Sequence, residues 1–532
     1  MASTTDDSGG ARDSDVKGGG GQAGPSGAYD EFGLRDFRRL FDSGALTYSE
    51  LLQYYLDRIA GLDRAGPTLG AVLHLNANAR AEAARLDRER TRGGARGPLH
   101  GIPVLVKANI NIAEASLPTT AGSLALKGFV APSDAELVSS LRRAGAIILG
   151  TTNMSEWANF RSTRSTSGWS SEGGLTRNPY ALDRNPSGSS SGSAVAVSAN
   201  LCALAVGTET DGSIIAPSSK CGIVGIKPSV GLVSREGIIP ISASQDTAGP
   251  MARTVEDAAI LLTAMAGAGG SGGVAGAGGA GAAGGAGLLQ FLNAIPDDLR
   301  LDGLRIGVAR TLAGYDPAVD RVFAVALDAL RGLGAEVIES DFACGKDLDE
   351  AAFEVLLYEF KDGLNRYLRA YAGSSGIHDL GDLIAFNADH ANAVMPWFHQ
   401  EIFAMAAAKG SLDDEAYLKA RRTCLRLTRD EGIDAAMGRL SLDALVAPSG
   451  GPACKTDLFL GDHYIGGSAS PAAIAGYPNL TVPAGFVHGL PVGLSVFGRA
   501  FAEQTLLRVA LAFERVSRAR RKPGFASTLD PF

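Results

Sequence analysis

Hydrophobic positions along the chain follow two periods, one typical of amphipathic helices and the other typical of short buried strands. The helical period comes first, and the apolar side chains that share one face of a predicted N-terminal helix are Leu34, Phe37, Leu40 and Phe41. A second helix is predicted to start at Thr47, because Thr47 and Glu50 have the spacing of a capping box. Residues 77–90 predict a third, exposed amphipathic helix.

Beyond residue 100 the pattern changes to short apolar runs separated by helical segments. The runs that predict strands are residues 101–110, 146–153, 202–210, 304–310, 445–447, 480–482 and 492–497. Helices are predicted at residues 193–200, through most of 317–432 and at 502–518. Short strands that alternate with helices indicate an α/β fold, and strands on both sides of the long helical block indicate one sheet interrupted by an insertion.

Two segments follow neither period. Residues 1 to about 27 are rich in glycine, serine and aspartate, and we expect a disordered N-terminal tail over residues 1–27. Residues 266–287 are almost entirely glycine and alanine, which predicts a flexible surface insertion because ordering a glycine run costs much conformational entropy. Residues 28–525 are expected to form a single large domain that contains this insertion.

Composition and charge argue against several classes of function. The 49 Lys and Arg residues against 57 Asp and Glu residues give a net charge of -8, which disfavours binding to nucleic acid or to an anionic membrane. No run of about 18 uncharged apolar residues predicts a membrane span, and the polar N-terminus lacks the apolar core of a secretory signal. Five scattered cysteines without metal-binding spacing disfavour disulfides and metal sites, and they favour a cytoplasmic location.

Residues 185–217 carry the pattern that points to chemistry, since two clusters of serine and glycine flank one predicted helix and one predicted strand. The clusters cover residues 187–193 and 210–213, and a helix followed by a returning strand would bring them to the same end of a sheet. Glycine lets successive backbone N–H groups point into one concavity, as the oxyanion of acyl transfer requires. A neighbouring serine can act as a nucleophile there if a base removes its proton.

A lysine is a better candidate for that base than a histidine. None of the seven histidines lies in a recognisable motif, whereas Lys107 lies in the apolar run 101–110. Burial would lower the pKa of Lys107, and a fall of roughly 3 units from about 10.4 would make it a base near neutral pH. Residues 188–192 also match G-x-S-x-G, but the Asn-Pro pairs before them break the strand that a nucleophile elbow at Ser190 needs.

The two clusters and Lys107 belong to a longer series of distinctive segments. These segments are GIPVLVKANI (101–110), GTTNMSEWANF (150–160), NPSGSSSGS (185–193), GTETDGSIIAPSS (207–219), GIVGIKPSVGLVSREGIIPIS (222–242), QDTAGPMARTVEDAA (245–259), GYPNLTVPAG (476–485) and LPVGLSVFGR (490–499). Together they resemble the amidase signature family of hydrolases over nearly all of residues 30–520, and the forms SGSSSGS, SEWANFRS and GTETDGSI are most similar to the peptide amidase branch. The resemblance implies a single large domain in which helices cover both faces of a large mixed β-sheet.

The resemblance also implies roles for individual residues. Lys107 matches the base, Ser189 the serine that bridges base and nucleophile, and Ser213 the nucleophile. The residues whose backbone N–H groups match the oxyanion hole are Thr210, Asp211, Gly212 and Ser213. Ala108 departs from the family pattern, which commonly has aspartate at this position, and so removes one charge partner or hydrogen-bond acceptor beside Lys107.

These roles predict an amidohydrolase that cleaves a carboxamide to a carboxylate and ammonia through an acyl-enzyme intermediate, with no metal or organic cofactor. The branch resemblance favours C-terminal peptide amides, while small aliphatic and aromatic amides stay open as substrates. One alternative is the glutaminase (A) subunit of a glutamyl-tRNA(Gln) or aspartyl-tRNA(Asn) amidotransferase, and another is a non-catalytic binding protein of the same fold. For the amidohydrolase we expect no nucleic acid, membrane or obligatory protein partner, and a homodimer stays open.

Overall fold

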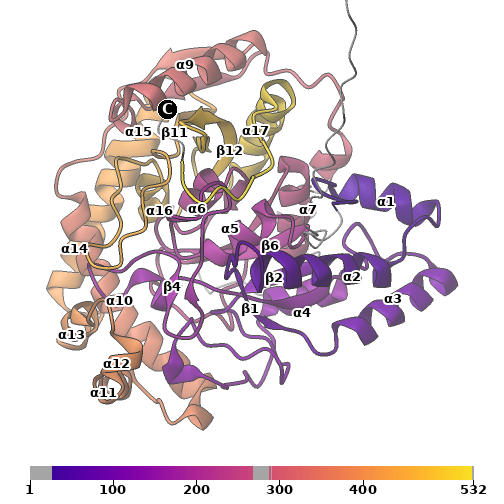
Figure 1. Cartoon of the computed structure of the whole chain (residues 1–532). Coiled ribbons are helices and arrows are strands. Elements are labelled where there is room, and N and C mark those ends of the chain that lie inside the picture. Colours follow the sequence, from indigo (N-terminus) through magenta and orange to yellow (C-terminus); the bar gives the residue numbers. More distant parts are fainter. Residues whose placement is uncertain (1–26, 268–286, 289, 530–532) are drawn as a thin grey trace, which may run out of the picture.

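The computed structural model describes residues 27–267, 287, 288 and 290–529 (Figure 1). The predicted N-terminal tail and the predicted glycine- and alanine-rich insertion therefore lie outside the described residues, apart from a few positions at their edges. Within these ranges, no helix has the length and apolar character that crossing a membrane requires.

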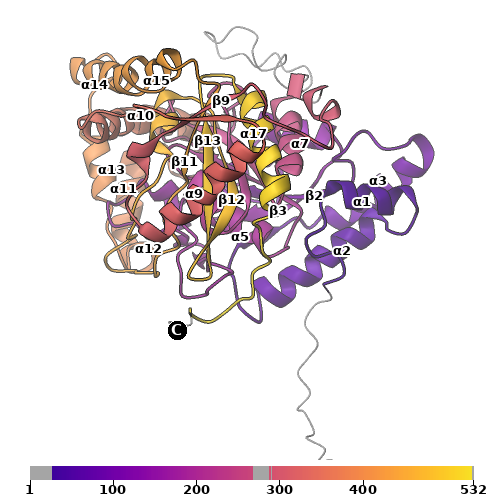
Figure 2. The ribbon, with the colours of Figure 1, turned by 90° about the horizontal axis from the view of Figure 1, so that it is seen from above.

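A mixed sheet forms the centre of the described fold (Figure 2). Its strands are β1 (Val72–Leu75), β2 (Pro103–Lys107), β3 (Ile147–Thr152), β6 (Leu204–Glu209), β7 (Val224–Lys227), β8 (Thr247–Ala252), β9 (Arg305–Val308), β10 (Glu336–Glu339), β11 (Ala444–Pro448), β12 (Asn479–Val487) and β13 (Leu490–Phe497). Their order is β1-β3-β2-β6-β8-β7-β12-β13-β11-β9-β10. The neighbours β3-β2-β6 and β11-β9-β10 run parallel, and the other neighbours pair antiparallel. The short strands β4 (Trp169–Ser170) and β5 (Gly174–Leu175) form a separate hairpin.

Helices surround this sheet (Figure 1). They are α1 (Leu34–Asp42), α2 (Tyr48–Arg58), α3 (Ala79–Gly93), α4 (Glu136–Arg143), α5 (Ser191–Ser198), α6 (Ile215–Lys220), α7 (Val255–Ala266), α9 (Pro317–Gly332), α10 (Leu348–Tyr371), α11 (Leu380–Asp389), α12 (Ala391–Val394), α13 (Glu401–Ala407), α14 (Glu415–Leu425), α15 (Asp434–Arg439), α16 (Ser470–Ala475) and α17 (Glu503–Ser517). The predicted capping box is present at the start of α2, where Thr47 and Glu50 each accept the other's backbone N–H.

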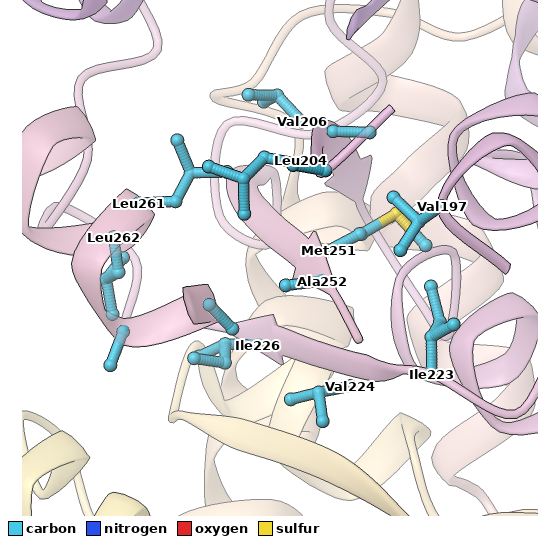
Figure 3. Close-up of a cluster of buried hydrophobic side chains, with 14 of the residues drawn as sticks. Val197, Leu204, Val206, Ile223, Val224, Ile226, Met251, Ala252, Leu261 and Leu262 are labelled. Atoms are coloured by element: carbon cyan, nitrogen blue, oxygen red, sulfur yellow. The ribbon is translucent and has the colours of Figure 1, made fainter. Parts of the chain in front are cut away.

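Small residues on three neighbouring strands let two buried helices approach one face of the sheet. A Cβ on Gly207, Gly225 or Gly249 would lie 2.2–2.9 Å from side chains in or beside α5 and α6. Because side chains alternate along a strand, the large residues next to these glycines point to the opposite face, against α7 (Figure 3). The side chains of this second layer include Leu204, Val206, Val224, Ile226, Leu261 and Leu262. Helices therefore cover both faces, as the family resemblance implied.

The long helical block is an insertion in the sheet, as its pattern predicted. Strands β9 and β10 precede helices α10 to α15, and β11 then returns to pair between β9 and β13. Four strands of the large sheet were not predicted, namely β1, β7, β8 and β10, and neither was the β4–β5 hairpin. Strand β8 contains Gly249 and Pro250, which both have low strand propensity, and it forms because β6 and β7 pair with it on its two sides.

Candidate active site

The two serine–glycine clusters meet at the end of β6. Ser189 lies just before α5, and Ser213 lies between β6 and α6. The backbone N–H of Ser189 donates to Ser213 Oγ at 3.2 Å, and the backbone N–H of Ser190 donates to the Ser213 carbonyl at 3.2 Å. Glycine at 188 permits this approach, because a Cβ on Gly188 would lie 3.2 Å from Ser213 Cα and 2.5 Å from Pro217. The expected meeting of the two clusters is confirmed.

Lys107 joins these serines from the neighbouring strand. It is the last residue of β2, which runs parallel to β6, and its side chain is completely buried. Its Nζ lies 2.7 Å from Ser189 Oγ, 2.8 Å from Thr208 Oγ1 and 3.1 Å from the Thr208 carbonyl oxygen. These oxygens belong to neutral groups. We refer to Lys107, Ser189, Thr208 and Ser213 as the lysine–serine cluster.

The surroundings of Lys107 favour its neutral form. Burial lowers the pKa of Lys107 to about 7, since the ammonium form loses its hydration. The carboxylates of Asp246 and Glu209 act in the opposite direction, but burial is the larger effect. Position 108 adds no charge, because it carries the buried side chain of Ala108. Near neutral pH a substantial fraction of Lys107 is therefore an amine that can accept a proton.

A buried carboxylate fixes the turn that follows β6. Glu209 Oε2 accepts the backbone N–H of Ile214 at 2.6 Å and that of Ile215 at 2.9 Å. Between these anchor points Gly212 has a φ of +76°, a left-handed conformation that glycine adopts without strain. The turn from residue 210 to residue 213 is thus held in one shape by groups at both of its ends.

Thr210 and Asp211 are each tied to another segment through their side chains. Thr210 Oγ1 donates to Asp246 Oδ1 at 2.5 Å, and Ser470 Oγ donates to Asp211 Oδ1 at 2.9 Å. Burial raises the pKa of Asp246 to about 6. The side chains of Thr210 and Asp211 are both engaged in these contacts. This is consistent with a catalytic role for the backbone N–H groups of residues 210–213 and not for the carboxyl group of Asp211.

Sequence reasoning missed three polar neighbours of the cluster. Thr208 supplies two of the contacts of Lys107 Nζ, and Asn109 Nδ2 donates to Thr208 Oγ1 at 3.1 Å. Asp246 holds Thr210, as described above. All three lie inside segments that resemble the family. Their place in a shared segment was the one signal that the sequence offered for these three residues.

A cavity of about 600 Å³ adjoins the cluster. Its lining includes Asn109, Thr208, Asp246, Glu236 and Tyr371. Such a volume suits a small organic ligand. In residues 27–267 and 290–529, no group of three or more His, Cys, Asp or Glu side chains is placed to hold a metal ion.

Comparisons with known proteins decide the family. The family model described as Amidase matches residues 50–507, which is most of the chain. The chain belongs to the amidase family. A probable amidase of Arabidopsis thaliana is 38% identical over 504 residues, which cover 92% of this chain and 91% of the relative. The glutamyl-tRNA(Gln) amidotransferase of Symbiobacterium thermophilum has an A subunit that is 36% identical over 503 residues, which cover 90% of this chain and 96% of that relative.

Solved structures of family members have the same fold. The native peptide amidase of Stenotrophomonas maltophilia is 48% identical, with a TM-score of 0.85 over 94% of this chain and 99% of that one. An amidase family protein of Bacillus anthracis is 34% identical, with a TM-score of 0.81 over 93% of each chain. The predicted fold class and family are confirmed, and this member of the amidase family is an amide-hydrolysing enzyme.

Proposed function

We propose that the enzyme hydrolyses carboxamides through Lys107, Ser189 and Ser213, with an acyl-enzyme intermediate on Ser213. One observation carries this proposal above the others: Lys107 Nζ lies 2.7 Å from Ser189 Oγ in a completely buried position. A surface lysine would be protonated at neutral pH, whereas burial lowers the pKa of Lys107 to about 7. Burial therefore supplies the base that a serine nucleophile requires.

The contacts of Nζ suggest the direction in which protons move. A neutral amine has two hydrogens and one lone pair, and the two oxygens of Thr208 can accept both hydrogens. The lone pair is then directed at Ser189, whose hydroxyl donates to Nζ. As Ser213 Oγ attacks the carbonyl carbon, its proton passes to Ser189 Oγ while the Ser189 proton passes to Lys107 Nζ.

The turn at residues 210–213 supplies the complementary stabilisation. Backbone N–H groups in this turn would donate to the oxyanion that forms when Ser213 attacks the amide. The relay then runs in reverse and protonates the leaving nitrogen, so that ammonia departs and an ester to Ser213 remains. Water attacks this ester, with the same relay as the base, and releases the carboxylate and free Ser213.

C-terminal peptide amides are the substrate class that we propose. The 48% identity to a peptide amidase over 94% of this chain supports this class above small aliphatic or aromatic amides. In this proposal the enzyme acts in the cytoplasm, without a metal, an organic cofactor or an obligatory protein partner.

Ser213→Ala tests the proposal, with Ser218→Ala as its matched control. Ser218 is also buried, five positions further on, and its hydroxyl has no partner among the described residues. Ammonia release from an N-acetylated peptide amide should fall about 10³-fold or more in Ser213→Ala, and labelling by a serine-directed fluorophosphonate should disappear. Ser218→Ala should keep both. A Ser213→Ala protein that is folded and fully active would refute the assignment of the nucleophile.

The glutaminase subunit of a tRNA-dependent amidotransferase is a second candidate, because relatives with that name are 33–36% identical over most of this chain. Such a subunit would release ammonia from glutamine and deliver it within a complex. Glutamine hydrolysis that appears only with a co-purifying protein would favour this candidate. Ammonia release from peptide amides by the isolated chain would favour peptide amidase activity.

A further inference from the structure

Large apolar side chains gather in a surface loop between β11 and α16. Phe459 is 69% exposed, Leu460 68% and Ile465 46%, whereas side chains of this size are usually buried. Trp397, from the loop between α12 and α13, is 38% exposed and packs edge-on against Phe459, with ring centroids 5.5 Å apart. We refer to Trp397, Phe459, Leu460 and Ile465 as the apolar rim.

Hydrogen bonds tie the loop of the apolar rim to the first serine cluster. Asp462 Oδ1 accepts from Asn185 Nδ2 at 2.6 Å and from the backbone N–H of Ser167 at 3.1 Å. The hydroxyl of Tyr464 donates to Asp462 Oδ2 at 2.6 Å and lies 3.3 Å from Ser187 Oγ. Residues 185 and 187 immediately precede Ser189, so the loop is anchored beside the lysine–serine cluster.

The same loop continues to the turn of the oxyanion-hole candidates. Ser470, at the start of α16, donates to Asp211. A Cβ built on Gly212 would lie 3.5 Å from the Cβ of Ala469. The segment that begins at the apolar rim therefore contacts Ser187 at one point and the turn at residues 210–213 at another. Both contacts lie beside Ser213.

A buried lysine holds the anchor of the loop in place. Lys220 Nζ lies 4.3 Å from the ring centroid of Tyr464 and 3.4 Å from Ser187 Oγ, and the residue is only 4% exposed. The hydrogens on Nζ can interact with the electron-rich face of this ring. The position of Tyr464 is thereby fixed, and the rim residues on either side of it are exposed on an ordered loop.

We infer that the apolar rim binds an apolar side chain of the peptide part of the substrate, upstream of the amide that Ser213 attacks. This inference rests on the proposed peptide amidase function. An exposed apolar patch marks a binding surface, and the loop that carries this one contacts Ser187 and Asp211 beside the groups that would hold the reacting amide. A bound peptide would use both regions, because its C-terminal amide would lie at Ser213 and its apolar side chain would lie at the rim.

Kinetics on a matched peptide series test the inference. The reference is N-acetyl tetra-alanine amide, and the other substrates carry one phenylalanine at the first, second or third position of the same peptide. The native enzyme should prefer phenylalanine at one of these positions by about tenfold in kcat/KM, through KM. In the double variant Phe459→Ser/Leu460→Ser this preference should fall to about onefold, while hydrolysis of alaninamide stays unchanged.

The design keeps folding and chemistry separate from recognition. The backbone N–H groups of residues 459 and 460 are held by Asp457 Oδ1 at 2.9 Å, so the loop does not depend on the two side chains that are replaced. Val325→Ser, which changes an equally exposed side chain on α9 (67% exposed), is the control and should keep the preference. Thermal unfolding should be the same in both variants and in the native chain.

Each other outcome has a distinct meaning. If peptide amides are hydrolysed but the native enzyme shows no preference, or the double variant keeps it, the inference about the rim is wrong and the proposed function stands. If no peptide amide releases ammonia while small amides do, the proposed substrate class is wrong, and the rim inference falls with it. If sedimentation shows that the double variant dissociates an oligomer while the preference is unchanged, the rim is a contact between copies of the chain.

Discussion

The lysine–serine cluster and the apolar rim are linked through the hydrogen bonds of Asp462 and Tyr464 to Asn185 and Ser187, yet their environments are opposite. In the cluster, polar groups are buried and meet one another at 2.7–3.2 Å, as Lys107, Ser189 and Ser213 do. In the rim, large apolar groups such as Phe459 face solvent. Both arrangements cost stability, because polar groups are more stable in water and large apolar groups are more stable when buried.

The two environments give the enzyme two different properties. Burying Lys107 costs stability, and in return the amine becomes a base near neutral pH. Exposing Phe459 and Leu460 leaves apolar surface in water, and a ligand can recover that free energy when it binds. Chemistry and recognition therefore respond to different perturbations, and variants of the two regions should separate rate from selectivity.

The largest effect on the side of chemistry is expected for Lys107→Met. This change removes the base and should lower kcat by about 10³-fold or more, on every amide alike. It should also raise the melting temperature near pH 7, because a flexible apolar side chain replaces a buried amine. Steady-state kinetics and calorimetry on the same preparation check both effects.

The pH dependence of stability provides a control for the effect of Lys107→Met on the melting temperature. The pKa of Lys107 is about 7 in the folded chain and about 10.4 when unfolded, so between these values the unfolded chain binds more protons. The stability of the native enzyme should then rise with pH across this window relative to Lys107→Met. If the native enzyme and Lys107→Met differed in melting temperature by the same amount at pH 7 and at pH 10, the pKa of Lys107 would not be lowered in the folded state.

The pH dependence of the native enzyme should show the next largest effect. Only the neutral form of Lys107 accepts a proton, so kcat/KM should fall about tenfold per pH unit below pH 7 and level off above it. The preference for a phenylalanine-containing peptide should not change with pH, because no rim residue titrates. A rate that rises as the pH falls would contradict a neutral lysine base.

Sequence reasoning went furthest where local pattern and chemistry agree. Lys107, Ser189 and Ser213 lie in segments whose glycines and apolar neighbours predict a turn, a buried strand and a helix start, and the structure brings all three together. Their catalytic roles stay a proposal. The helical block was predicted from its period, which a long amphipathic segment shows clearly.

Tertiary context decided the features that could not be predicted. Phe459 and Leu460 would have passed for core residues from their type alone, since nothing local tells whether a helix or strand covers them. Strand β8 has the composition of a loop and is a strand because two neighbours pair with it. Thr208 touches Lys107 only because β2 and β6 are parallel neighbours whose register places Lys107 beside this part of β6.

The smallest of these effects is expected for Thr208→Val, which removes one acceptor of Lys107 Nζ and leaves the Thr208 carbonyl in place. Because a charged donor loses more than a neutral one, the pKa of Lys107 should fall further and the acid limb of the pH profile should shift to lower pH. The less well oriented amine should lower kcat by roughly tenfold. Thr119→Val is the matched control, since Thr119 is buried and its hydroxyl has no partner among the described residues. If Thr208→Val instead altered the preference among peptide amides at unchanged kcat, Thr208 would act in recognition, and the division between cluster and rim would fail.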